Sequence, residues 1–183
     1  LSYVRRVVLP MGVGEETVKY LKDKKIQPAV EVPAAIFGGD DAIYNLLIKA
    51  RKNGISLAAV CSLDGATIAK KAGMKLCALP GTNIFNTFSL DEFAHLGFTD
   101  AILSTELKIA QCASLGGKLP RGVFAYGHLP LMQTRNCPVK NGTTCDKCRK
   151  HGSLTDRMGV TFPVECTPFA STLLNSVPIV ESD

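Results

Sequence analysis

The chain has no apolar run that approaches the roughly 18 to 20 residues needed to cross a membrane. Its first ten residues, LSYVRRVVLP, do not read as a signal peptide, because their apolar run is short and no small-residue cleavage site follows. We therefore expect no membrane association. The chain also lacks a first methionine and enters a strand-like run almost at once, which leads us to expect a piece of a longer protein.

Several motifs of common enzymes are missing as well. Glycine-rich turns near Gly12, Gly38 and Gly116 fit neither G-x-x-x-x-G-K-[ST] nor G-x-G-x-x-G, so nucleotide binding by these loops is not expected. The G-x-S-x-G nucleophile elbow and the H-E-x-x-H metalloprotease helix are also absent. There is no internal repeat and no low-complexity tract. The function must be sought in other features.

The totals are those of an ordinary globular protein. The 183 residues suffice for one domain with little room for a second, and 46% are hydrophobic and 20% charged. Seven cysteines are an odd number, so complete pairing within the chain is impossible. Cys61, Cys77 and Cys112 lie in apolar contexts, where a free cysteine behaves as a small hydrophobe. This usage leads us to expect a reducing, cytoplasmic location.

Short apolar runs alternate with amphipathic segments through the first part of the chain. Helical period is clear over Asp41–Asn53, and Gly54 stands where a helix commonly ends. Ser89 and Glu92 predict a capping box that opens a further helix, which Gly97 closes. The expected strands are Val4–Leu9, Ala29–Val32, Leu57–Cys61, Leu76–Leu79, Ala101–Leu103 and Val123–Tyr126.

This alternation predicts the α/β class, with βαβ units and a parallel sheet that is covered on both faces. Six strands suit either an incomplete TIM-like barrel or an open sheet. We expect a β/α body over residues 1–131. Residues 132–183 are expected to form a cysteine-rich loop and a β-hairpin that pack on the same domain, with hairpin strands near Leu154–Thr155 and Val160–Val164.

Four cysteines gather in the last third of the chain, with the spacing C-x7-C-x2-C-x17-C over Cys137, Cys145, Cys148 and Cys166. The two-residue gap between Cys145 and Cys148 lets both sulfurs point at one metal ion, and four thiolates can hold zinc or an iron–sulfur cluster. Residues 134–153 contain almost no apolar side chains, so something other than hydrophobic burial must order them. A disulfide pair and an unligated loop are the alternatives.

The sequence around these cysteines is rich in lysine and arginine and contains a single acidic residue, Asp146. The basic side chains either balance the negative charge of a thiolate site or form a surface that faces the phosphates of RNA. These RNA-facing candidates are Arg135, Lys140, Lys147, Arg149 and Lys150.

His128 follows an expected strand end, a place where barrel enzymes collect their active-site residues. It is a candidate catalytic residue, with an ordinary loop position as the alternative. Cys61 also ends an expected strand and either packs in the core or faces the same mouth of the sheet.

From Asp100 to Ile179 the chain resembles the carboxy-terminal half of the collagenase-like peptidase family U-thirty-two, whose protease mechanism was never assigned. The first 80 residues resemble it weakly. His128 stands where the family usually has arginine, and the family's glutamate- and cysteine-rich amino-terminal stretch is absent. The strings that carry the resemblance are AILSTELKIAQ, VFAYGHLPLMQTRNCP, CDKC, LTDRMGVTFPVEC and LLNSVPI.

Members of this family take part in hydroxylating a wobble uridine of tRNA, a cytidine of ribosomal RNA, and ubiquinone precursors without oxygen. The resemblance implies a four-iron four-sulfur cluster on Cys137, Cys145, Cys148 and Cys166, with Cys61 as a substitute ligand. Zinc is the alternative metal.

The resemblance thus implies the iron–sulfur-binding, carboxy-terminal domain of a tRNA or rRNA hydroxylation protein. Its partners would be the amino-terminal half of the full-length protein and the RNA. Two other functions stay open. One is a peptidase acting on collagen-like or other peptides, and the other is a non-catalytic module that binds RNA or a partner. Whether the piece is itself an enzyme also stays open.

Overall fold

The structure of the protein is a computed structural model that describes residues 3–140, 142, 144–148 and 151–180. It divides into two compact units, each described here by itself. Unit 1 comprises Leu1–Ala34 and Gly38–Val123, and unit 2 comprises Ala35–Phe37 and Phe124–Asp183. In the described part of the chain, no helix is both long and apolar enough to span a membrane.

Unit 1 alternates strands and helices as the sequence predicts. In chain order its elements are β1 (Arg6–Leu9), α1 (Glu15–Asp23), β2 (Gln27–Glu31), α2 (Asp40–Lys52), β3 (Leu57–Val60), α3 (Leu63–Lys71), β4 (Lys75–Ala78), the 3-10 turn η1 (Pro80–Thr82), α4 (Thr87–His95), β5 (Phe98–Ile102), α5 (Ile109–Ser114) and β6 (Arg121–Gly122).

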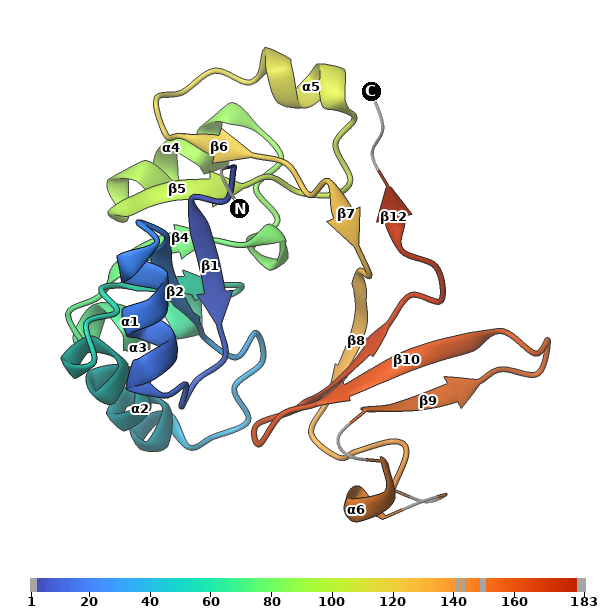
Figure 1. Cartoon of the computed structure of the whole chain (residues 1–183). Helices are drawn as coiled ribbons and strands as arrows, with labels where there is room; N and C mark the ends of the chain where they lie inside the picture. The colour runs from blue at the N-terminus through green and yellow to red at the C-terminus, as the bar shows by residue number, and fades with distance from the viewer. Residues whose placement is uncertain (1–2, 141, 143, 149–150, 181–183) are drawn as a thin grey trace. The chain divides into compact units, whose positions relative to one another are not determined.

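The six strands of unit 1 form one sheet in the order β1-β2-β3-β4-β5-β6, and every neighbouring pair is parallel. The sheet is curled into a half-barrel, and α1, α2 and α3 lie side by side along it (Figure 1). This confirms the α/β class and the parallel β/α units.

Two local expectations were wrong. The sixth strand is β6 rather than Val123–Tyr126, because the last parallel ladder bond runs from Leu103 N to Gly122 O at 2.9 Å. Helix α4 begins at Thr87, ahead of the Ser89–Glu92 box, because Asn86 caps it. The Asn86 Oδ1 accepts the Ser89 N–H at 2.8 Å.

Four helices of unit 1 end in the same way. The residue two positions beyond each helix has a left-handed backbone, with φ of 58° at Lys25, 90° at Gly54, 72° at Gly73 and 90° at Gly97. Glycine adopts this conformation freely, whereas a lysine there costs about 1 kcal/mol. The next residue in each case is buried and starts the path into the following strand: Ile26, Ile55, Met74 and Phe98.

In α1, α2 and α3, a basic side chain of each helix reaches the end of the next helix. The Lys22 ammonium of α1 lies against Gly54, just after α2. Arg51 of α2 donates from Nη1 to the carbonyl oxygen of Ala72 at 3.3 Å, and Lys70 of α3 donates to that of Leu96 at 3.2 Å. These cations satisfy or face the carbonyl-rich ends of helices, where positive charge is favourable.

An ion pair across the inner face shows how tightly the sheet curls. Arg6 lies in β1 and Asp100 in β5, and in a flat sheet strands four positions apart are separated by about 19 Å. Nevertheless, Arg6 Nη1 lies 2.6 Å from Asp100 Oδ1 and Nη2 lies 2.9 Å from Oδ2. A two-pronged contact of this kind requires β1 to approach β5 over the intervening strands.

Small side chains on the inner face allow this approach. Ala29, Leu57, Ala59 and Cys77 form a buried cluster against which Leu79 packs. Three of these five side chains are alanine or cysteine, so strands β2 to β4 can curl without leaving a large void. The inner face is therefore a filled core and not an open channel.

Unit 2 is built from antiparallel strands. Its elements are β7 (Tyr126–Gly127), β8 (Pro130–Thr134), α6 (Cys145–Cys148), β9 (His151–Thr155), β10 (Thr161–Cys166), β11 (Ser171–Leu174) and β12 (Ile179–Val180). One sheet has the order β8-β11-β10-β9, and β7 pairs with β12 (Figure 1). The expected hairpin is present as β9 and β10. Asp156 holds its turn, since Oδ1 accepts the N–H groups of Met158 and Val160 at 2.8 and 2.9 Å.

We predict that the Arg6–Asp100 pair stabilises unit 1. The side chains are 31% and 24% exposed, between the surface and buried classes of ion pair. Asp100→Asn should lower the free energy of unfolding by about 1–3 kcal/mol in a urea titration, because it leaves the Arg6 charge without its carboxylate.

The matched control is the double variant Arg6→Met with Asp100→Leu. It removes both charges and should recover most of the lost stability. An Asp100→Asn protein as stable as the parent chain would contradict a role of this pair in holding the curl.

Candidate metal centre

The strand order of unit 2 brings two distant cysteines together. Strands β8 and β10 both pair antiparallel with β11, so they run in the same direction and end at the same edge of the sheet. Thr134 of β8, Ser171 of β11 and Cys166 of β10 lie in one row across that edge. Cys137 lies three residues after the end of β8, beside Cys166.

The two sulfurs lie 3.5 Å apart, from Cys137 Sγ to Cys166 Sγ. This is longer than the roughly 2.05 Å of a disulfide. It is close to the about 3.8 Å that separates two thiolates bound at about 2.3 Å to one tetrahedral zinc ion. The Ser171 hydroxyl donates to Cys166 Sγ at 3.3 Å. The pair is thus pre-arranged for a shared ligand and carries its own hydrogen-bond donor.

Val139 holds the backbone after Cys137 against the sheet. Both of its methyl groups lie where a side chain at Gly152 would begin, at 2.8 Å from the Cβ position. Gly152 pairs with the buried Val164, so the contact joins the loop to the centre of the sheet. The Lys140 N–H returns to the Cys137 carbonyl oxygen at 3.3 Å. Glycine at 152 is required by this close approach.

Hydrogen bonds favour the thiolate form of Cys137. Slight burial acts to raise the pKa of Cys137, but hydrogen bonds from Cys166 and from the backbone of Val139 and Lys140 outweigh it and lower the pKa. Thiolate is the form of cysteine that binds metals and reacts with electrophiles.

Cys61 and Cys77 have the opposite character. Burial raises the pKa of each thiol to about 11, helped by the charge of Glu31 beside Cys61 and of Asp100 beside Cys77. The Cys61 side chain also lies under η1, since a Cβ at Gly81 would come within 2.8 Å of Cys61 Cβ. Cys61 as a substitute ligand stays a prediction.

The other two predicted ligands lie on α6, a single helical turn. Cys145 and Cys148 occupy its first and last positions, three residues apart. Cys145 is exposed, and the Cys148 side chain lies outside what the structure describes. Among the described residues, no disulfide forms, and no group of three or more His, Cys, Asp or Glu side chains could hold a metal ion. The four-cysteine site therefore stays a prediction, of which the structure brings one pair together.

His128 forms a structural contact within unit 2. Its Nδ1 donates to the carbonyl oxygen of Asn175 at 2.7 Å, and the Leu129 N–H donates to Asn175 Oδ1 at 2.7 Å. These bonds tie the β7–β8 junction to the chain after β11. They also fix the neutral imidazole in the tautomer whose Nε2 accepts protons.

Of the predicted RNA-facing residues, Arg135, Lys140 and Lys147 are exposed in unit 2. Arg149 and Lys150 lie outside the described residues. The described three are consistent with a solvent-facing basic segment around α6.

The sequence reasoning missed Ser171 and the Val139–Gly152 contact. Ser171 is one of two buried polar residues in the described chain and bonds to the Cys166 sulfur. Its pairing with Cys166 across a four-residue turn is the signal that could have revealed it. The Val139–Gly152 contact had no such signal, because it joins a loop to a strand.

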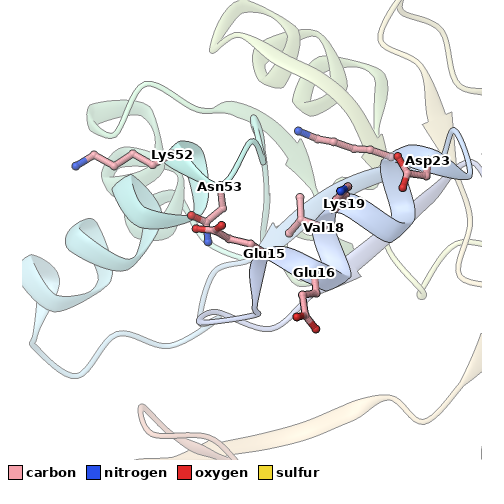
Figure 2. A pocket seen from close by; sticks show the side chains of 8 residues that line it. Glu15, Glu16, Val18, Lys19, Asp23, Lys52 and Asn53 are labelled. Atoms are coloured by element: carbon pink, nitrogen blue, oxygen red, sulfur yellow. The ribbon is translucent and has the colours of Figure 1, made fainter.

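Unit 1 has a surface hollow of about 500 Å³ between α1 and the end of α2. Figure 2 shows Lys52 and Asn53 of the α2 end together with Glu15, Val18 and Lys19 of α1. Its lining mixes charges of both signs and includes none of the predicted site residues.

Comparison of the chain with protein-family models, with curated proteins and with solved structures finds no match.

The cysteines should differ in reactivity, which can be measured on reduced, chelator-treated protein. At about pH 8, iodoacetamide should modify Cys137 at least about 10-fold faster than Cys61 or Cys77, because only Cys137 has a lowered pKa. Peptide mass spectrometry over time gives the individual rates. Equal rates at Cys61 and Cys137 would show that the thiolate character assigned to Cys137 is wrong.

Proposed function

We propose that this chain is the metal-binding, carboxy-terminal part of a U-thirty-two-type protein that acts in tRNA or rRNA hydroxylation. The observation that carries the proposal is the pairing of Cys137 with Cys166 at 3.5 Å, supported by a serine donor. The ligands would be Cys137, Cys145, Cys148 and Cys166, and a bound iron–sulfur cluster would supply electron transfer or activation.

The weak core of unit 2 supports a metal. Among the apolar side chains of its described part, Val164 and Ala170 alone are buried. Leu131, Met132 and Met158 are exposed. A unit of this size with so small a core needs another source of free energy, and a structural metal is a common one.

The identity of the metal rests on two different arguments. The family resemblance supports a four-iron four-sulfur cluster. The distance between the two sulfurs supports zinc, because cysteines on one ion lie closer together than cysteines on separate irons of a cluster. Zinc in a structural role is therefore the second candidate.

The half-barrel of unit 1 supports the proposal that the chain belongs to a longer protein. Its six parallel strands would be completed to a TIM-like barrel by the amino-terminal half of the longer protein. We place the protein in the cytoplasm, where the thiols stay reduced. Arg135, Lys140 and Lys147, with Arg149 and Lys150, would face the RNA.

No described contact favours proteolysis. His128 donates a hydrogen bond from Nδ1 to a backbone carbonyl oxygen, which explains its place as a structural contact, and a metal bound by four thiolates leaves no open position for water. A non-catalytic binding module would share the metal site and differ only in having no part in the hydroxylation reaction.

Metal analysis of anaerobically purified protein tests the proposal. We expect about four iron and four sulfide per chain with visible absorption, or about one zinc in a colourless protein. Cys166→Ser should lose most of the metal and expose residues 136–152 to proteolysis, while the helical circular-dichroism signal of unit 1 remains.

Cys112→Ser is the matched control, because Cys112 is buried in α5 of unit 1 and should not affect the metal. Absence of stoichiometric metal from the anaerobic protein would refute the proposal. So would a Cys166→Ser protein that keeps its full metal content.

A further inference from the structure

The amino end of the unit 1 sheet is unusually rich in exposed lysines. Helices α1, α2 and α3 end at this edge, directly before the starts of the neighbouring strands β2, β3 and β4. Among residues 22–25, 49–54 and 70–75, the one carboxylate is Asp23. We call six exposed lysines in these ranges the basic rim: Lys24, Lys25, Lys49, Lys52, Lys71 and Lys75.

Helix ends account for part of the positive charge at this edge, since Lys49, Lys52 and Lys71 lie in the last turns of α2 and α3. Three further cations make direct contacts there. Lys22, Arg51 and Lys70 already reach the ends of the following helices. Within the described residues, no rim lysine makes an ion pair or a side-chain hydrogen bond; Lys24 lies 5.9 Å from the Tyr20 ring centre. The rim is thus a cluster of positive charge that no carboxylate in the described chain neutralises by direct contact.

The backbone at Lys25 gives an independent sign that this charge is not there for stability. Lys25 has φ of 58° at the second position after α1. Gly54, Gly73 and Gly97 occupy the same position after α2, α3 and α4. Glycine would relieve the strain at Lys25. A strained lysine with no side-chain partner in the described structure points to a role outside the folded chain.

The chemistry of this edge fits a soluble polyanion. The apolar residues Ile26, Ile55 and Met74 at the helix ends are all buried, and the half-exposed Tyr20 ring lies beside the Lys24 ammonium, so this edge offers little apolar surface to a lipid layer. Neighbouring helices lie about 10 Å apart, so the rim spans about 20 Å, which is enough to meet several phosphates of one strand. Lys52, which also borders the hollow beside α1, is among these cations (Figure 2).

We propose that the amino end of the unit 1 sheet binds the phosphate backbone of RNA through the basic rim. The choice of RNA rests on the proposed function, whereas the affinity for phosphates rests on the rim alone. This surface is separate in sequence from the basic segment around α6. It positions the strand without reading its bases.

Fluorescence anisotropy with a fluorescein-labelled single-stranded RNA of about 20 nucleotides tests the proposal on the whole chain. If about four phosphates are contacted, the logarithm of the association constant should fall with the logarithm of salt with a slope of about −3. Lys49→Gln with Lys71→Gln should weaken binding about 10-fold at low salt and reduce the slope by about 1–2.

The matched control is Lys108→Gln with Arg157→Gln, which removes the same charge from exposed residues that do not belong to the rim and should change the affinity less than about twofold. Lys25→Gly is the sharper variant. It should raise the melting temperature by about 2–4 °C because the backbone strain is relieved, and yet weaken RNA binding. Lost affinity in a more stable protein cannot come from misfolding.

The outcomes separate this inference from the metal proposal. Rim variants that weaken RNA binding in chelator-treated protein support the rim, whatever the metal content. Rim variants that bind like the control overturn it, even where RNA binding itself is found. Binding to vesicles of anionic phospholipid, with none to RNA under the same salt, also overturns it.

Discussion

The curl of the parallel sheet is the constraint on which the rest of unit 1 depends, and the ion pair of Arg6 with Asp100 is the contact that marks it. The ion pair joins strands that a flat sheet would hold far apart, so it is both a consequence of the curl and a restraint on it. Because the strands curl around a small inner core, the helices are gathered on the outer side. Their ends then meet at one edge of the sheet, where Lys22, Arg51 and Lys70 join each helix to the next.

Unit 2 is stabilised differently. Its described apolar side chains are mostly half-buried or exposed, and the order of its strands places two thiols where a metal could join them. Its local order comes from specific polar contacts, such as Asp156 in the hairpin turn and Asn175 beside His128. The two units therefore draw on different sources of free energy, burial in the first and polar or metal contacts in the second.

Much of unit 1 could be predicted from the sequence, because its signals are local. Helical period and the glycines at 54 and 97 mark helices and their ends, and the ends agree with the structure. The start of α4 was misplaced because two polar residues competed for the cap, and Asn86 preceded Ser89. The sixth strand was misplaced because a short edge strand has little periodicity.

The sequence by itself determined the class of fold, the helix ends and the candidate thiols, since each depends on residues a few positions apart. Only the tertiary structure decided that Cys137 meets Cys166, that Ser171 donates to that sulfur, and that Arg6 meets Asp100. These contacts join residues on strands whose order no local pattern encodes. Strand order is selected by the burial of whole faces and by the closure of loops, and both are properties of the complete chain.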